Sequence, residues 1–332
     1  MKSKLKKILL GLAVITIIPT KVYCAEVSME HVYKIPSGVT TDLGLYRIKK
    51  SSRDSEQNYD FMPKIIIKDG GNNHIGYCID VEENLKSGDS ISPYNQTLEQ
   101  YLSSKNISNA NQIAKKINEY IYYGYKTTDV TAKENGEYYA ATQQLIWETL
   151  SNAGYRSAEY NTVIPFRISG NESTIVDLTK EKNEIISKIN NHYKTPSFCS
   201  SNEKLELAVG ETATYTDNNG VLSNYNVECS EGIKCEKDGN NLKVSILSDS
   251  GEQNIAFTKN GDGVGTTLYK EGNNQAVVIN EGKIEPVSCS FGVDTYKNVQ
   301  TSGIKIVTII SIGMLFGLTA YLIYYKKENL NN

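Results

Sequence analysis

The sequence predicts an α+β domain followed by an all-β sandwich of the Ig-like type, with a membrane-directed segment at each end of the chain. Residues up to about 193 mix helical and strand-like patterns and are rich in tyrosine, whereas later residues form short strand-like runs between Asn, Gly and Asp turns. The chain has 332 residues, which exceeds the length of one typical domain. We therefore expect the α+β domain over 25–195 and the sandwich, a stalk, over 196–297.

The first residues are typical of a secretory signal peptide. Lysines within the first seven residues precede an apolar stretch over 8–18. We expect residues 1–24 to be removed by a cut before Ala25, although a cut directly after Ala25 also fits. An uncleaved anchor helix fits less well, because the apolar stretch is shorter than the roughly 20 residues that cross a bilayer.

The C-terminal end predicts an anchor over residues 298–332. Residues 306–325 are almost wholly apolar, and Lys326 and Lys327 follow at once. Roughly 20 apolar residues span a bilayer, and the positive charge after them predicts that the short tail lies in the cytoplasm. The sequence therefore predicts a protein on the cell surface with its ectodomain outside.

A sorting motif precedes the apolar segment. Residues 298–303, Asn-Val-Gln-Thr-Ser-Gly, resemble the Asn-x-Gln-Thr signals of Gram-positive sortases, although Ser302 stands where glycine or asparagine is commoner. The order of motif, span and basic tail would let a sortase cut after Thr301 and join it to the cell wall. Attachment to the wall and plain anchoring in the membrane both stay open.

Charge and composition exclude several classes of function. The net charge is -3, and no basic cluster occurs outside the two ends, which argues against nucleic-acid binding. The three histidines are scattered and no Cys-x-x-Cys pair occurs. The sequence therefore supports no metal site, and we expect no cofactor.

The second half carries strand-like runs at 205–209, 242–246 and 276–279, which we place in the sandwich. Its four cysteines allow three pairings. We favour Cys229–Cys235, which closes a small local loop, and Cys199–Cys289, which would tie the first strand of this domain to the last. Both bridges are consistent with an oxidising compartment.

Cys78 is the cysteine left over, because Cys24 falls in the predicted signal peptide. A leftover thiol in a secreted chain risks mispairing, so we expect it to have a function. Residues 64–68 and 75–79 read as two strands joined by a tight turn at 69–73, which places Cys78 on the return strand of a hairpin.

Three helices are predicted in the first half. Ile113, Ile117 and Ile121 recur every four residues and define one helical face, which Gly124 ends. A second helix is expected over about 138–150. A third passes through Leu178 and Ile189.

Two short motifs together resemble a known family. Tyr-Cys-Ile-Asp at 77–80 and Thr-Gln-Gln-Leu-Ile-Trp at 142–147 are similar, in order and spacing, to the paired signature of thioester domains in Gram-positive surface adhesins. Leu145 departs from the alanine that is common in that signature. The resemblance implies that Gln143, four residues before Trp147, forms the bond with Cys78, and that Gln144 does not.

The chemistry that this resemblance implies follows from the residue types. A cysteine thiolate held rigidly against a glutamine amide can displace ammonia and leave a buried thioester. A lysine amine on a host or surface partner would then take the acyl group from Gln143. Trp147 shares a helix face with Gln143, so we expect Trp147 and Tyr77, with Tyr138 or Tyr139, to shield the bond from water. Such a protein is an adhesin that reacts once and not a turnover enzyme.

Two other readings of Cys78 stay open. A surface-anchored cysteine hydrolase or transglutaminase-like enzyme would pair it with a histidine: His74 lies nearby in sequence, and His31 or His192 could approach in the fold. No local signature of a cysteine peptidase surrounds Cys78. A non-covalent binding module, in which the thiol is incidental, is the third reading. The loss of one ammonia distinguishes the thioester from both.

Overall fold

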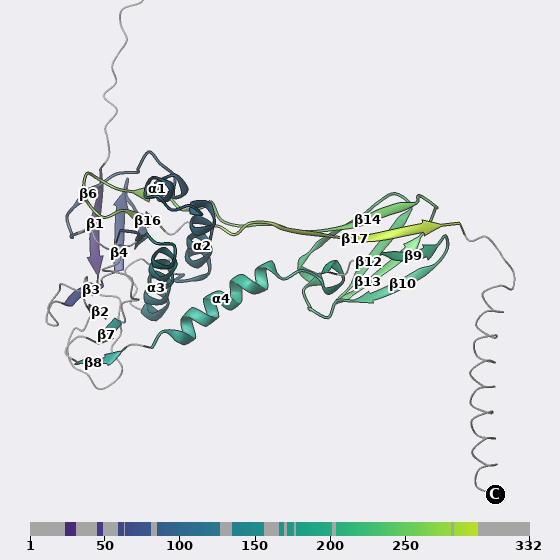
Figure 1. Cartoon of the computed structure of the whole chain (residues 1–332), viewed down its shortest axis with the longest axis horizontal. Coiled ribbons are helices and arrows are strands. Elements are labelled where there is room, and N and C mark those ends of the chain that lie inside the picture. Colours follow the sequence, from purple (N-terminus) through teal and green to yellow (C-terminus); the bar gives the residue numbers. More distant parts are fainter. Residues whose placement is uncertain are drawn as a thin grey trace, which may run out of the picture. The chain divides into compact units, whose positions relative to one another are not determined.

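The computed structural model describes residues 24–30, 45–48, 59–62, 64–80, 85–126, 135–155, 166–168, 171–175, 177–200, 204–279 and 282–297 (Figure 1). The chain divides into two compact units. The first comprises Met1–Tyr193 and Asn260–Pro286, and the second comprises Lys194–Lys259 and Val287–Asn332. The predicted signal peptide, sorting motif and apolar C-terminal segment lie outside the described residues, apart from Cys24. No helix in the described part of the chain is long and apolar enough to cross a membrane.

The first unit is built on a six-stranded sheet with the order β15-β16-β5-β4-β1-β6. Its strands pair antiparallel and are β1 (Ala25–Glu30), β4 (Lys64–Asp69), β5 (Asn72–Cys78), β6 (Ser90–Ile91), β15 (Leu268–Tyr269) and β16 (Val277–Ile279). The predicted hairpin is confirmed as β4–β5. Gly70 and Gly71 turn it with φ of 55° and 88°, values that favour glycine.

A second, four-stranded sheet in this unit has the order β3-β2-β7-β8. Its strands are β2 (Leu45–Ile48), β3 (Tyr59–Met62), β7 (Phe166–Ile168) and β8 (Asn171–Ile175). All three of its strand pairs are antiparallel. The α+β character predicted for the first domain is therefore confirmed.

Four helices complete the first unit: α1 (Leu98–Ser104), α2 (Ala110–Tyr123), α3 (Gly136–Asn152) and α4 (Thr179–Tyr193). The last three match the predicted helices, and the isoleucine face of α2 is buried as expected. The sequence analysis did not identify α1, although Thr97 and Gln100 form a capping box at its start. Helices α1, α2 and α3 gather beside the six-stranded sheet, with which they share one hydrophobic core (Figure 1).

The segment 260–286, which we call the insert, is the main difference from the sequence-based expectation. We placed 276–279 in the sandwich, but the insert leaves the second unit after β14 and contributes β15 and β16 to the first. Residues 276–279 form a continuous apolar run, and each of them is at most 3% exposed. Such a run suits a strand covered on both faces rather than an alternating sandwich strand. The stretch 196–297 therefore does not form one continuous domain in this structure.

The second unit is a two-sheet sandwich. One sheet has the order β10-β13-β12 and the other β11-β14-β17-β9. Its strands are β9 (Leu205–Ala208), β10 (Thr212–Thr216), β11 (Asn226–Cys229), β12 (Ile233–Asp238), β13 (Asn241–Ile246), β14 (Glu252–Lys259) and β17 (Val287–Tyr296). Tyr215 of β10 contacts Phe291 of β17, with ring centroids 5.3 Å apart, so the two sheets share a core.

Both favoured disulfides are present. Cys229–Cys235 joins β11 to β12, and Cys199–Cys289 joins the short 3-10 turn Ser197–Ser200 to β17. Cys199 therefore lies just before the first strand of the unit and not on it. Among the described cysteines, only Cys24 and Cys78 lie outside disulfides.

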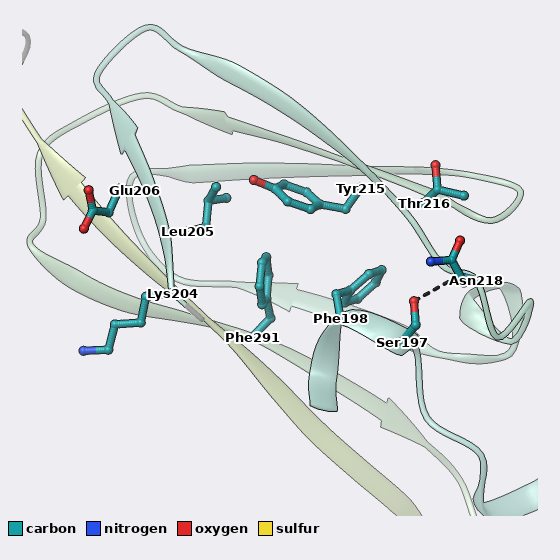
Figure 2. A pocket seen from close by; sticks show the side chains of 9 residues that line it. All are labelled: Ser197, Phe198, Lys204, Leu205, Glu206, Tyr215, Thr216, Asn218 and Phe291. Carbon is teal, nitrogen blue, oxygen red and sulfur yellow. Dashed lines mark hydrogen bonds between the residues drawn. The ribbon is translucent and has the colours of Figure 1, made fainter. Parts of the chain in front are cut away.

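A hollow opens on the second unit where the edge strands β9 and β10 belong to different sheets (Figure 2). Phe198, Tyr215 and Phe291 line it, and Phe291 contacts each of the other two rings. Ser197 Oγ accepts a hydrogen bond from the Asn218 N–H at 2.9 Å on its rim. Lys204, which also lines it, is mostly exposed and pairs with Glu252. The hollow is thus a gap between two sheet edges with an aromatic floor.

Candidate functional site

Cys78 is the last residue of β5, a central strand of the six-stranded sheet. Strand β4 pairs with one side of β5 and β16 with the other, where Val277 lies opposite Cys78. A Cβ at Gly76 would lie 2.7 Å from Val277 Cγ1, so glycine at this position allows β16 to approach. Cys78 is only 3% exposed. Strand β16 therefore lies beside Cys78 on one side, whereas the pairing with β4 ends at Gly76.

Gln143 lies on α3 and its side-chain amide meets the backbone of Cys78. Gln143 Oε1 accepts a hydrogen bond from the Cys78 N–H at 2.7 Å, and Gln143 Nε2 donates to the Cys78 carbonyl oxygen at 2.8 Å. The side chain is 1% exposed, which is rare for a glutamine unless its polar atoms are bonded. Gln144, by contrast, is half-buried. The fold thus brings together Gln143 and Cys78, which are 65 positions apart.

Trp147 lies one helical turn after Gln143 and its indole contacts the same peptide. Trp147 Nε1 donates a hydrogen bond to the Cys78 carbonyl oxygen at 3.1 Å, and the side chain is 7% exposed. The sequence analysis expected an apolar cover at this position. The hydrogen bond was not expected, and the i, i+4 spacing on a helix is the signal that could have indicated it.

The tyrosines named as possible shields divide into two groups. Tyr77 is fully buried and stacks on Tyr139 of α3, with ring centroids 4.9 Å apart, and burial raises the pKa of both phenols. Tyr139 Oη donates to the Gly76 carbonyl oxygen at 2.8 Å and accepts from the Ile65 N–H at 3.1 Å. Tyr138 instead bonds to Glu184 of α4. Tyr139 therefore docks α3 onto β4 and β5, and Tyr138 does not take part.

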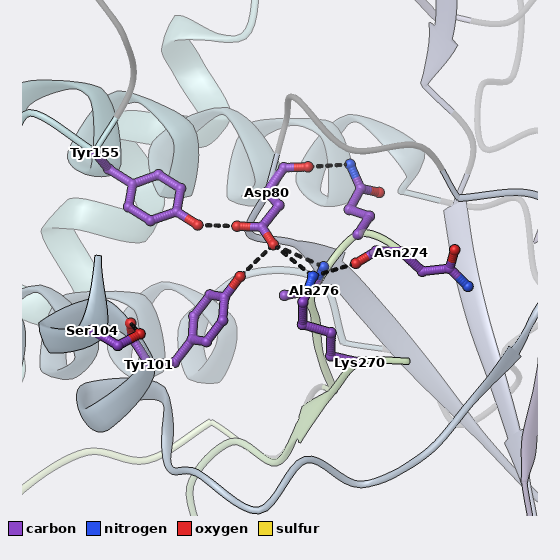
Figure 3. Close-up of polar contacts among 8 residues, drawn as sticks. Asp80, Tyr101, Ser104, Tyr155, Lys270, Asn274 and Ala276 are labelled. Carbon is purple, nitrogen blue, oxygen red and sulfur yellow. Dashed lines mark hydrogen bonds and ion pairs between the residues drawn. The ribbon is translucent and has the colours of Figure 1, made fainter. Parts of the chain in front are cut away.

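Asp80 is a buried carboxylate two residues after Cys78, and the sequence analysis did not assign it a role. Its side chain accepts hydrogen bonds from Tyr101 of α1 and from Tyr155, and it forms an ion pair with Lys270 of the insert (Figure 3). Its place in the Tyr-Cys-Ile-Asp motif was the only signal in the sequence. Glu148, the other acidic residue near the motifs, pairs with Lys182 at 2.7 Å.

Two of the three histidines, His74 and His192, lie in the described part of the chain. His74 lies four residues earlier on β5, which separates the two Cα atoms by about 13 Å along a strand, too far for a direct hydrogen bond. His192 is buried at the end of α4, where its Nε2 lies 2.8 Å from the Glu285 carbonyl oxygen. His31 lies outside the described residues. Among the described residues, no cluster of three or more His, Cys, Asp or Glu side chains could hold a metal ion.

Comparisons with known proteins agree with the motifs. Residues 75–194 match the family model "TED: Thioester domain". No curated protein matches the chain.

Three solved structures of proteins from Gram-positive bacteria are similar to this chain. The thioester domain of the Staphylococcus aureus TIE protein is 18% identical, with a TM-score of 0.47, over 83% of this chain and 100% of that one. The Bacillus anthracis TIE protein is 12% identical, with a TM-score of 0.31, over 82% of this chain and 49% of that one. The thioester domain of the Enterococcus faecium TIE86 protein is 19% identical, with a TM-score of 0.27, over 83% of this chain and 95% of that one. Both motifs lie within the matched residues, so residues 75–194 of this chain are similar to a thioester domain.

Proposed function

We propose that this protein is a single-turnover covalent adhesin, in which Cys78 and Gln143 form an internal thioester and pass the acyl group to a lysine amine of a partner. The observation that carries the proposal is the reciprocal pair of hydrogen bonds, 2.7 and 2.8 Å, between the Gln143 amide and the Cys78 peptide. The match of 75–194 to the thioester domain family supports it.

The first step joins Cys78 to Gln143. The Cys78 sulfur attacks Gln143 Cδ, the S–C bond forms, and the Cδ–Nε2 bond breaks. Nε2 leaves as ammonia and carries away the proton that the thiol loses, so atoms and charge balance without a co-reactant. A well-oriented intramolecular pair reaches effective molarities of about 10⁵ M or more. The Cys78 N–H, bonded to Gln143 Oε1, is placed to stabilise the negative charge that develops on that oxygen.

Trp147 has a role both before and after ammonia leaves. The Cys78 carbonyl oxygen accepts from Gln143 Nε2 and from Trp147 Nε1. Loss of Nε2 removes the first donor, and the indole N–H remains as the second. A buried carbonyl oxygen without a donor is costly, so Trp147 stabilises the thioester state in addition to excluding water.

The second step transfers the acyl group. A neutral lysine amine attacks Gln143 Cδ, an amide forms, the S–C bond breaks, and Cys78 recovers its thiol with a proton from the amine. The product is a stable amide, so each molecule reacts once. We further propose that the second unit, an Ig-like stalk, carries this domain at the cell surface, and that residues 298–332 anchor it to the membrane or, through sortase and Thr301, to the wall.

Intact mass under non-reducing conditions tests the thioester. We expect the secreted ectodomain, residues 25–297, to be lighter by one ammonia than its calculated mass with two disulfides. Cys78→Ala and Gln143→Ala should each have the calculated mass of their own sequence. Gln144→Ala is the matched control and should keep the deficit. A wild-type ectodomain at full mass with a titratable Cys78 thiol would refute the thioester.

Reaction with amines tests the adhesion step. Methylamine should add to Gln143 and expose one thiol at Cys78, and a protein partner should give an adduct that survives boiling in SDS. The Cys78→Ala variant should give neither product. If the ectodomain carries the thioester but no amine reacts with it, the bond is a structural cross-link and the adhesin proposal is wrong. Binding that disappears on boiling would indicate the non-covalent module.

A further inference from the structure

The insert 260–286 lies outside the region that matches the thioester family, yet it contacts the end of β5 and the two residues that follow. Strand β16 pairs with residues 76–78. Beyond the strand, the Ile79 N–H donates to the Ala276 carbonyl oxygen at 2.9 Å, and Gln275 Nε2 donates to the Asp80 carbonyl oxygen at 2.6 Å. The insert therefore contacts three consecutive residues of the Tyr-Cys-Ile-Asp motif after Tyr77.

One peptide group connects the insert to the reactive pair. The Cys78–Ile79 peptide directs its N–H to Ala276 in the insert and its carbonyl to Gln143 and Trp147 on α3. In a planar trans peptide the N–H and the C=O point in opposite directions. The insert and α3 therefore hold one rigid plane from its two sides, and a rotation that loosened the bond to Ala276 would also turn the carbonyl that orients the Gln143 amide.

Asp80 fixes this arrangement through its side chain. Asp80 Oδ2 accepts from the Ala276 N–H at 3.2 Å and from Tyr101 Oη at 2.5 Å, and it lies 3.4 Å from Lys270 Nζ (Figure 3). Lys270 Nζ also donates to the Asn274 carbonyl oxygen, which closes the turn before Ala276. Asp80 is 4% exposed and the Lys270 side chain 12%. Removing one partner of such a buried pair leaves an uncompensated charge and is far more disruptive than loss of a surface pair.

We propose that Lys270 and Asp80 are positioning residues for the thioester, and that the insert is a working part of the reactive site. Neither side chain transfers a proton or touches the reacting atoms in this proposal. They hold the Cys78–Ile79 peptide so that Gln143 stays within reach of the thiol. A displacement of about 1 Å can slow a positioned reaction by about 100-fold. The inference rests on the proposed thioester function.

The test compares Lys270→Met with Lys283→Met in the ectodomain 25–297. Lys283 lies in the same insert and forms an ion pair with Glu285, but both side chains are about half exposed (45% and 44%), so it is the matched control. The readouts are the fraction of folded molecules that lack one ammonia and the methylamine rate of those that carry the thioester. We expect Lys270→Met to reduce the occupancy or the rate at least about tenfold. Lys283→Met should match wild type, and Lys270→Arg, which can still pair with Asp80, should recover most of the loss.

The outcomes separate the two proposals. A wild-type ectodomain at full mass would refute the thioester function itself. A wild type with the thioester, together with a folded Lys270→Met variant of unchanged occupancy and rate, would overturn the positioning role alone. A lower melting temperature without a change in either readout would also overturn it. If Lys270→Met fails to fold, Tyr101→Phe, which removes one donor to Asp80 and keeps the ring, should still reduce occupancy or rate, and unchanged values would refute the inference.

Discussion

The first unit keeps Cys78 out of any disulfide and buries polar side chains around it, whereas the second unit pairs all four of its cysteines and buries few polar groups. Eight of the ten buried polar side chains in the described residues belong to the first unit, so the cost of burying polarity is concentrated there. Asp217 is one of the two buried polar side chains in the described part of the second unit. Burial opposes its ionisation, but backbone N–H groups such as those of Val221 and Leu222 hold the pKa of Asp217 below its usual range.

The buried polar groups of the two units have different roles. In the second unit the buried polar groups close turns and the disulfides resist unfolding, which suits a stalk. In the first unit, Gln143, Asp80 and Gln275 are buried around residues 78–80, which suits chemistry that depends on position. The insert links the two units along the chain, because it follows β14 of the sandwich and adds β15 and β16 to the six-stranded sheet.

Excision of the insert should have the largest effect on this contrast. Lys259 and Val287 lie opposite each other in the β14–β17 pair, so an Asn-Gly turn can replace residues 260–286 without disturbing the sandwich. The first unit would lose six apolar side chains of its hydrophobic core cluster, on the order of 10 kcal/mol, which is comparable with the whole stability of a domain. We expect calorimetry to show the transition of the second unit at its normal temperature and loss of the first, and mass analysis to show no thioester. A variant that still lost one ammonia would contradict this expectation.

Loss of the long disulfide should act on the opposite unit. Replacing Cys199 and Cys289 with serine opens a bridge between residues 90 positions apart, and should destabilise the second unit by about 4–5 kcal/mol. The short bridge Cys229–Cys235 should be worth about 2 kcal/mol. Denaturant unfolding of each double variant measures both values. The ammonia deficit should remain in both, and its loss would show that the two units are not independent.

Trp147→Phe should give the smallest effect and the most specific one. The variant keeps an aromatic ring but removes the Nε1 donor to the Cys78 carbonyl oxygen, which should cost about 1–2 kcal/mol. Because that oxygen has lost Gln143 Nε2 in the thioester state, we expect faster hydrolysis, measured by mass as conversion of Gln143 to glutamate. Tyr138→Phe removes a hydroxyl that bonds to Glu184 and should hydrolyse at the wild-type rate. Equal hydrolysis rates in the two variants would show that Trp147 contributes only through packing.

Features that depend on local pattern or on residue counts were predictable from the amino-acid sequence. The hairpin that carries Cys78 follows from two strand-like runs around a glycine turn, and the helix that carries Gln143 follows from its apolar periodicity. Cysteine counting separated Cys78 from the four that form disulfides, because an oxidising compartment leaves few alternatives. Spacing on a helix also placed Trp147 beside Gln143.

Only the tertiary structure decided which strand pairs with Cys78 and what holds its peptide in place. Val277 lies opposite Cys78 although the two residues are about 200 positions apart, and an apolar run such as 276–279 fits any sheet whose two faces are both covered. For the same reason the partners of Asp80, which come from α1, from Tyr155 after the end of α3 and from the insert, were not predictable. A residue pattern can indicate that a strand or a carboxylate is buried, but the packing of segments that are distant in sequence determines its partner.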